Sequence, residues 1–272
     1  NNNSAVVSED SSGKQSPSVD SHDSTSMDGS DYHVMQVLPH DITAFTQGLT
    51  YFRGYLYETT GNHGKSQVRR MDPNTGQVLE AKKVDDQYFG EGVTHFIDKN
   101  GEACLIQLTW EEKTGFIYRI SDLELLKTFH YETTNGQGWG ITYDESKREF
   151  IVSDGSSWLL FWDRDSLQEK KRVQVQLTRH EQDTIKTIPI NHLNELEYYN
   201  GYVLSNVWYT NVILRIDPET GNVERIHHFD NIYKDRHEKA DCFNGIALSE
   251  KTGELFVTGK WWPHLYRIKL FD

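Results

Sequence analysis

Short runs of alternating hydrophobic and polar residues, separated by tight turns, recur five times along this chain. Each recurrence starts with a short entry, in most cases a polar residue beside glycine, continues as a hydrophobic strand and a turn, and ends in a second strand that stops at a polar or aromatic residue. The five segments are FTQGLTYFRGYLYETTG from Phe45, FGEGVTHFIDKNGEACLIQLTW from Phe89, GWGITYDESKREFIVSDG from Gly138, LNELEYYNGYVLSNVW from Leu193 and FNGIALSEKTGELFVTGK from Phe243. A third strand of another recurring type follows each segment.

A repeat of about 50 residues built from short strands and Gly/Asn/Asp turns is typical of a β-propeller, in which each repeat forms one blade. The five repeats therefore predict an all-β fold, a five-bladed β-propeller. Two turns of sequence DPxTG, from Asp72 and Asp217, support the strand assignment. Proline presets the first turn position and glycine adopts a positive φ.

The two ends of the chain are expected to meet in the last blade. The fifth repeat has only three clear strands before the chain stops at Asp272, and an alternating segment, YHVMQVLP, begins at Tyr32. We expect Tyr32 to Leu38 to supply the missing outer strand, because this closes the ring and removes exposed strand edges. Residues 164–192 and 228–242 are longer connections, and long loops are expected to lie over one mouth and shape the substrate entrance.

Composition separates a tail from the propeller. Residues 1–30 are rich in Ser and Asp and poor in large apolar groups, which predicts a disordered tail, with the propeller spanning 31–272. The formal net charge of -13 argues against a nucleic-acid partner. The chain has no run of 18 apolar residues, so we predict no membrane-spanning helix. Cys104 and Cys242 are expected to be free buried thiols, with a disulfide between them as the alternative.

Chemically distinctive side chains occupy equivalent places in the repeats. At the starts of the innermost strands stand Gln47, Glu91, Trp139, Asn194, Glu195 and Asn244, and at the ends of the second strands stand Trp110, Asp154, Trp208 and Lys260. A propeller brings these places together around one mouth of its channel. A carboxyl such as Glu91, buried among indoles and amides, has a raised pKa and suits proton transfer near neutral pH. The alternative is a structural ring that binds channel water.

At these residues the chain resembles the plant-type glutaminyl cyclases, also called glutaminyl-peptide cyclotransferases. The motifs that carry the resemblance span residues 34 to 270 and are FTQGL, YETTG, FGEG, LTW, GWGITYD, SDGS, LNELE, NVW, RIDPETG and LFVTGKWWP. Each motif is weak alone, but together, in the family's order, they are specific. The fold of that family is a five-bladed propeller, in agreement with the repeat count.

The resemblance implies a reaction in which an N-terminal glutamine of a peptide or protein cyclises to pyroglutamate and releases ammonia. The family's catalytic glutamate falls on Glu91, which would act first as base and then as acid. We expect Gln47, Asn194 and Lys260 to donate hydrogen bonds to the γ-carbonyl oxygen. The remaining site residues implied by the resemblance bind and fold the substrate; they are Phe45, Phe89, Trp110, Trp139 and Trp208.

The sequence predicts catalysis without a metal or other cofactor. The 12 histidines are scattered, and neither HExxH nor a Cys/His cluster occurs. A structural Ca²⁺ in the channel stays an open alternative. Glu195 and Glu197 share one face of their strand, where they could hold a metal, pair with Lys260 or serve as strand-end polar groups.

Two other functions compete with a cyclase. One is a non-catalytic propeller that binds peptides or proteins through one face, and the other is a calcium-dependent, lactonase-like hydrolase. The plant-type resemblance favours an extracytoplasmic location in the secretory route or periplasm, and we expect a monomer.

Overall fold

The structure, a computed structural model, describes residues 31–181 and 184–271, and this part of the chain is built from strands and turns. The predicted tail, residues 1–30, lies outside the described residues. Within them, no helix is long and apolar enough to cross a membrane.

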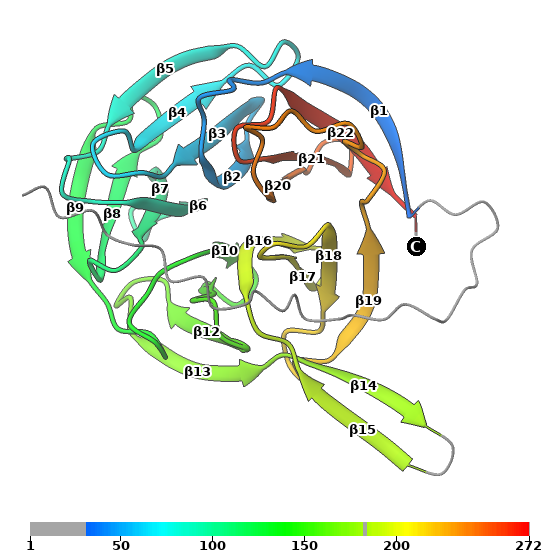
Figure 1. Cartoon of the computed structure of the whole chain (residues 1–272). Helices are drawn as coiled ribbons and strands as arrows, with labels where there is room; N and C mark the ends of the chain where they lie inside the picture. The colour runs from blue at the N-terminus through cyan, green and yellow to red at the C-terminus, as the bar shows by residue number, and fades with distance from the viewer. Residues whose placement is uncertain (1–30, 182–183, 272) are drawn as a thin grey trace, which may run out of the picture.

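Five antiparallel four-stranded sheets surround one axis (Figure 1). Blade one comprises β2 (Thr46–Phe52), β3 (Tyr55–Thr60), β4 (Gln67–Met71) and β5 (Val78–Lys83). Blade two comprises β6 (Gly90–Ile97), β7 (Ala103–Thr109), β8 (Thr114–Arg119) and β9 (Leu125–His130). Blade three comprises β10 (Ile141–Asp144), β11 (Glu149–Val152), β12 (Trp158–Asp163) and β13 (Glu169–Gln174). Blade four comprises β16 (Leu193–Tyr199), β17 (Tyr202–Val207), β18 (Val212–Ile216) and β19 (Val223–His228).

Blade five closes the ring as predicted. Its strands are β20 (Phe243–Ser249), β21 (Glu254–Gly259), β22 (His264–Leu270) and, on the outside, the N-terminal β1 (Tyr32–Pro39). β1 runs antiparallel to β22, with Tyr32 opposite Leu270 and Pro39 opposite His264. Figure 1 shows this blue strand beside the red one. The pairing holds the two ends of the described chain in one sheet, so the ring has no open seam.

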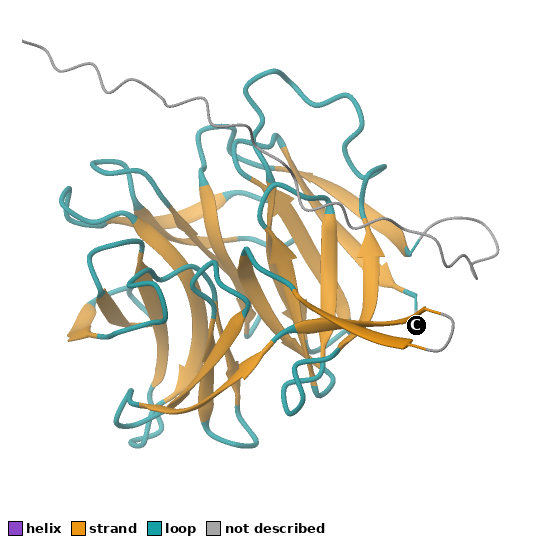
Figure 2. Ribbon diagram, turned by 60° about the horizontal axis from the view of Figure 1, so that its bottom comes forward, coloured by secondary structure: helices purple, strands orange, loops and turns teal. Residues whose placement is uncertain are grey.

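One long connection differs from the expectation. Residues 164–192 contain β13 and a separate hairpin of β14 (Gln176–Glu181) and β15 (Thr184–Pro189). This hairpin projects outward from the ring and does not cover the mouth (Figures 1 and 2). It can do so because its two strands satisfy each other's backbone groups through six paired positions.

The hydrophobic core lies between neighbouring blades. One cluster joins Phe96 and Cys104 of blade two to Phe150 and Trp162 of blade three. Similar clusters fill the other blade interfaces. Both cysteines are buried and free, so the alternative of a disulfide is wrong. They pack in different parts of the ring, Cys104 in this cluster and Cys242 beside blade five.

Glycines let the innermost strands touch at the backbone. The amide of Gly92 donates to the carbonyl of Trp139 over 2.8 Å, and a Cβ at Gly92 would lie 2.7 Å from the same oxygen. Any side chain here would push blades two and three apart, because real Cβ atoms do not approach a backbone oxygen so closely. The neighbouring residues Glu91 and Trp139 are thereby fixed close to the axis.

Candidate active site

A buried carboxyl and two amides from three blades form the centre of the site. Glu91, at the start of β6, is 4% exposed. Gln47 of β2 donates from Nε2 to Glu91 Oε1 over 3.2 Å. Asn244 of β20 donates from Nδ2 both to Gln47 Oε1 at 3.5 Å and to the carbonyl of Thr46 at 3.0 Å. This chain of amides orients Gln47 so that its NH₂ group faces the carboxyl.

The environment of Glu91 raises its pKa well above the ordinary value. Burial is the main cause, because an ionised carboxylate loses its hydration there. The charge of Lys260 acts in the opposite direction, and the charge of Glu112 adds to the increase. A carboxyl with a raised pKa gains and loses a proton closer to neutral pH, so it suits general acid–base chemistry.

Lys260 supplies a buried positive charge at the end of β21. Its Nζ lies 4.5 Å from the centroid of the Phe45 ring, and the residue is 4% exposed. The aromatic face offsets part of the cost of burying the ammonium group. The backbone is held on both sides, because Lys260 N donates to Cys242 O and Asp241 N donates to Lys260 O, each over 2.9 Å.

The predicted aromatic residues form two walls. In the first wall, Phe89 contacts Phe45 at 6.0 Å and Trp110 at 5.5 Å between ring centroids. In the second wall, Trp139 and Trp208 meet edge to face at 5.6 Å. The first wall comes from blades one and two and the second from blades three and four. The structure thus groups the five aromatic residues as two walls near the mouth.

Gln137 joins the two walls, and sequence reasoning missed it. Its Oε1 accepts hydrogen bonds from Trp110 Nε1 at 3.1 Å and Trp139 Nε1 at 2.8 Å. Its Nε2 donates to Glu111 Oε1 at 3.3 Å. A partly buried indole N–H needs an acceptor. A glutamine two residues before Trp139 was the feature of the sequence that could have indicated this acceptor.

Asn194 has a buried side chain with an unpaired acceptor atom. It is 2% exposed, and its Oδ1 accepts no hydrogen bond from any residue in the described part of the chain. Its backbone is fixed, because Ser153 Oγ donates to Asn194 O over 2.5 Å. Buried polar atoms normally find partners, so an orphaned oxygen beside the axis indicates a place for substrate or water.

Two other carboxylates of the predicted ring have structural partners. Glu195 accepts from Leu49 N at 3.1 Å and from Ile246 N at 2.7 Å, one bond to each oxygen. It therefore links blade four to blades one and five. Asp154 accepts from Ser156 N and Ser156 Oγ, at 3.0 and 2.5 Å, and so stabilises a turn.

Glu197 shares this structural character. Its Oε1 accepts from Leu248 N at 3.2 Å, and burial raises the pKa of both Glu197 and Glu195 well above the ordinary value. These contacts indicate that Glu195 and Glu197 accept hydrogen bonds from strand backbone amides, and they argue against a role as metal ligands or as partners of Lys260. Among the residues that the structure describes, no group of three or more His, Cys, Asp or Glu could hold a metal ion.

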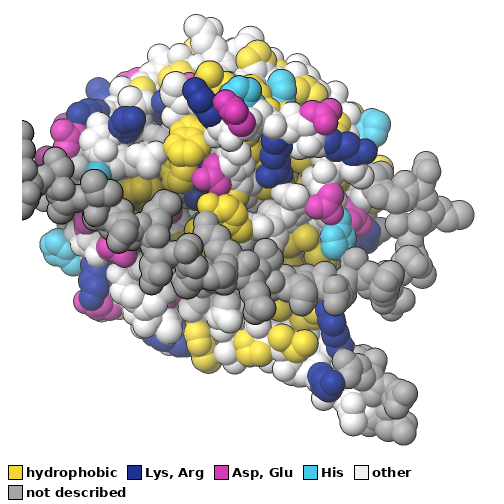
Figure 3. Space-filling view, in the orientation of Figure 1, with side chains coloured by type: hydrophobic (Ala, Val, Ile, Leu, Met, Phe, Trp, Pro, Cys, Tyr) yellow, Lys and Arg dark blue, Asp and Glu magenta, His cyan; other side chains and the backbone are white. Residues whose placement is uncertain are grey.

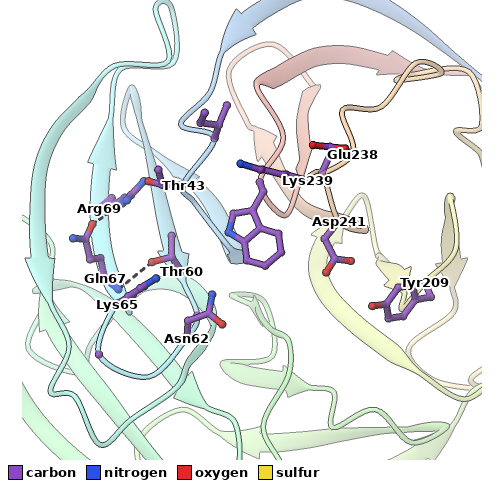
Figure 4. A pocket seen from close by; sticks show the side chains of 15 residues that line it. Thr43, Thr60, Asn62, Lys65, Gln67, Arg69, Tyr209, Glu238, Lys239 and Asp241 are labelled. Atoms are coloured by element: carbon purple, nitrogen blue, oxygen red, sulfur yellow. Dashed lines mark hydrogen bonds between the residues drawn. The ribbon is translucent and has the colours of Figure 1, made fainter. Parts of the chain in front are cut away.

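A cavity of about 870 Å³ opens beside the aromatic walls. The connection between β19 and β20 lines it through Glu238, Lys239 and Asp241, which agrees with the expectation for residues 228–242 (Figure 4). Glu91 itself does not line this cavity. Figure 3 shows the molecule in the orientation of Figure 1. Hydrophobic side chains near the centre of the described surface are surrounded there by charged side chains of both signs.

We predict that Gln137→Leu lowers kcat/KM about 10- to 100-fold, because two indoles lose their shared acceptor and small misplacements of positioning groups are costly. Gln137→Glu keeps an acceptor oxygen and should recover much of the loss. Steady-state kinetics and the near-ultraviolet circular dichroism of tryptophan measure both effects. The exposed Gln168→Leu is the control, and equal losses in Gln137→Leu and Gln168→Leu would contradict the bridging role.

The fold and the site together define a five-bladed propeller that brings the buried carboxyl of Glu91, amide side chains and a buried lysine close to two aromatic walls. The chain belongs to the glutamine cyclotransferase family, whose characteristic sequence matches residues 5–270. It is 38% identical over 244 residues to a glutaminyl-peptide cyclotransferase of Arabidopsis thaliana, covering 87% of this chain and 70% of that protein. It also resembles the crystal structure of Myxococcus xanthus glutaminyl cyclase, with a TM-score of 0.75, 29% identity, and coverage of 89% of this chain and 97% of that one. The resemblance seen in the sequence is thereby confirmed.

Proposed function

We propose that this chain converts the N-terminal glutamine of peptides or proteins to pyroglutamate with release of ammonia, and that Glu91 carries the proton. Membership of the glutamine cyclotransferase family supports the reaction. The observation that carries the assignment to Glu91 is its burial at the axis, with Gln47 as hydrogen-bond donor at 3.2 Å and a strongly raised pKa.

One carboxyl can serve both proton transfers of this reaction. Ionised Glu91 takes a proton from the α-amine as its nitrogen forms a bond to the carbonyl carbon of the side-chain amide. The same proton then passes to the amide nitrogen, the bond between that nitrogen and the carbonyl carbon breaks, and ammonia leaves. The charge of Lys260, which lowers the pKa of Glu91, favours the ionised form needed for the first transfer.

Donors beside Glu91 suit the oxygen that becomes negative. We assign Gln47, Asn194 and Lys260 to this oxygen. Gln47 directs its NH₂ group, which has two N–H donors, at Glu91, and Lys260 brings a buried positive charge. Asn194 would donate from Nδ2, the donor atom of its buried side chain. Fixed donors in a site that excludes water stabilise developing charge without reorganising.

The aromatic walls would supply the geometry of ring closure. Cyclisation joins two ends of one residue, so much of its acceleration comes from holding the flexible side chain in a folded pose. We propose that Phe45, Phe89 and Trp110 on one side, and Trp139 and Trp208 on the other, impose this pose.

The first test is mass spectrometry of a synthetic peptide with N-terminal glutamine, with and without a chelator. We expect the peptide to lose ammonia at the same rate in both conditions, because the proposed chemistry needs no metal. Abolition by the chelator, with recovery on added Ca²⁺, would instead support an essential ion. A chelator effect on melting temperature alone would point to a structural Ca²⁺ in the channel.

The same experiment separates the competing functions. A binding propeller would release no ammonia, and a calcium-dependent hydrolase would open lactones and lose that activity to the chelator. An extracytoplasmic location and a monomeric state are further proposals. Fractionation of the producing cells and sedimentation of the purified chain would test them.

A further inference from the structure

The 870 Å³ cavity borders the candidate active site through residues that pack on its aromatic walls. Three of its lining residues are the outer neighbours of site residues. Gly61 lies so close to the Phe89 ring that a Cβ there would clash with it. Trp261 packs on Phe45 at 4.8 Å between ring centroids. These lining residues of the cavity thus pack directly on Phe45 and Phe89 of the first aromatic wall.

Tyr209 makes the same connection on the opposite side of the cavity. Its ring lies 4.6 Å from that of Trp208, centroid to centroid. Figure 4 shows Tyr209 and Asp241 facing the blade-one residues Thr60 and Asn62 across the opening. A chain leaving a glutamine bound between the two aromatic walls would therefore pass into this cavity.

The cavity presents apolar groups to solvent. Ile42 is 64% exposed and Tyr209 is 49% exposed, and both line it. Charged side chains also line it, but Lys65 and Lys239 are balanced by Glu238 and Asp241. Arg69 is already paired with Asp41 at 2.9 Å. The charges that line the cavity give it no net preference for a charged side chain. Apolar contact therefore determines which side chain the cavity favours.

The backbone around the cavity is held in an unusual conformation. Asn62, Tyr209 and Trp261 have φ values of 80°, 61° and 59°. Asparagine tolerates this left-handed region, but bulky aromatic residues rarely adopt it, and such strain concentrates at ligand-binding places. Two aromatic residues at the same opening are strained, and each packs on one of the two aromatic walls.

We propose that this cavity is a subsite for the residue that follows the N-terminal glutamine, and that it selects a bulky apolar or aromatic side chain there. The inference rests on the proposed function and extends it to substrate choice. The occupant is defined by covalent continuity, because the second residue is bonded to the glutamine and the cavity borders both aromatic walls that would hold this glutamine. The volume falls in the range of small-ligand sites and exceeds one side chain.

The test compares glutaminyl-phenylalanine amide with glutaminyl-glycine amide. We expect kcat/KM to be about 10-fold higher for the phenylalanine substrate, the size that one buried apolar group contributes to discrimination. The ratio of the two values within one variant cancels any general change in activity. Ile42→Ser should lower this ratio about threefold, because roughly half of a side chain's apolar contact is lost. Tyr209→Asn, which tolerates the left-handed backbone, should lower it further.

Ile185→Ser is the matched control, since Ile185 is 67% exposed on the projecting β15. It should leave the ratio unchanged. A wild-type ratio near one, or a best substrate with aspartate or lysine in second place, would overturn the subsite while leaving the cyclase function in place.

If no glutaminyl substrate loses ammonia, the proposed function is wrong. The subsite is then judged by binding of pyroglutamyl-phenylalanine amide and pyroglutamyl-glycine amide, followed by tryptophan fluorescence. Tighter binding of the phenylalanine compound supports it, and equal affinity overturns it.

Discussion

Glu91→Gln is expected to lower kcat by about 10³-fold or more, with little change in melting temperature. General acid–base catalysis contributes roughly 10²–10⁴-fold, and here one group would perform both transfers. Glutamine has the same shape and keeps an oxygen for the hydrogen bond from Gln47, but it cannot take up and release a proton. Ammonia release from a glutaminyl peptide, followed over hours, measures the residual rate.

Glu112→Gln provides the matched control for this change. Glu112 accepts from Phe89 N at 3.2 Å, a bond that glutamine can keep, and its charge helps to raise the pKa of Glu91. Removing the charge lowers the pKa of Glu91, so the acidic limb of the pH–rate profile should move to lower pH. Activity requires ionised Glu91 and falls as the pH drops through its pKa. A loss in Glu112→Gln equal to that in Glu91→Gln would contradict the assignment.

The repeat and the closure of the ring were predictable because both depend on local patterns. Alternation and turn residues determine where strands begin and end. Because the fifth repeat lacks one strand, the segment from Tyr32 to Leu38 has one place to fill, and β1 occupies it. The position of Glu91 followed too, since equivalent places in propeller repeats converge on the axis.

Side-chain partners across blades could not be predicted in the same way. Gln137 lies in an irregular loop outside the repeat, and only the folded chain shows that its oxygen serves Trp110 and Trp139 together. The sequence left three roles open for Glu195, as a metal ligand, a partner of Lys260 or a strand-end polar group, and only the folded chain shows that its oxygens accept from two backbone amides. Such choices depend on distances between blades, which strand patterns do not contain.

A buried ion pair holds the segment that leads from the closing strand into blade one. His40 Nε2 donates to Glu58 Oε1 over 2.7 Å, and His40 Nδ1 donates to Trp262 O over 2.7 Å. Thr46 Oγ1 and Arg69 Nη1 also donate to Glu58, at 2.8 and 3.5 Å. Both side chains of the pair are fully buried. The pair thereby ties blade one to the connection after Lys260.

Glu58→Gln is expected to lower the free energy of unfolding by about 3 kcal/mol, because removing one partner leaves buried charges uncompensated. Urea denaturation measures the change. Glu80→Gln in the same blade is the control, since Glu80 pairs with Arg70 at 3.1 Å but is 26% exposed. Partly exposed pairs contribute about 1 kcal/mol or less, so equal effects of the two substitutions would contradict the role of the buried pair.

The pair also predicts how stability depends on pH. Burial by itself lowers the pKa of His40, but the carboxylate of Glu58 outweighs burial, so the net pKa is raised. The stability that His40 contributes is therefore present below its unfolded pKa of about 6.5 and is lost as the pH rises through its folded pKa. Burial by itself raises the pKa of Glu58, but the charge of His40 outweighs it and the net pKa is lowered. That contribution is present above the unfolded value of 4.5 and is lost as pH falls through the folded value. The difference in unfolding free energy between wild type and Glu58→Gln should therefore be largest between the unfolded pKa values of Glu58 and His40, and smaller at pH 9. A difference that grows with pH would contradict a charged His40–Glu58 pair.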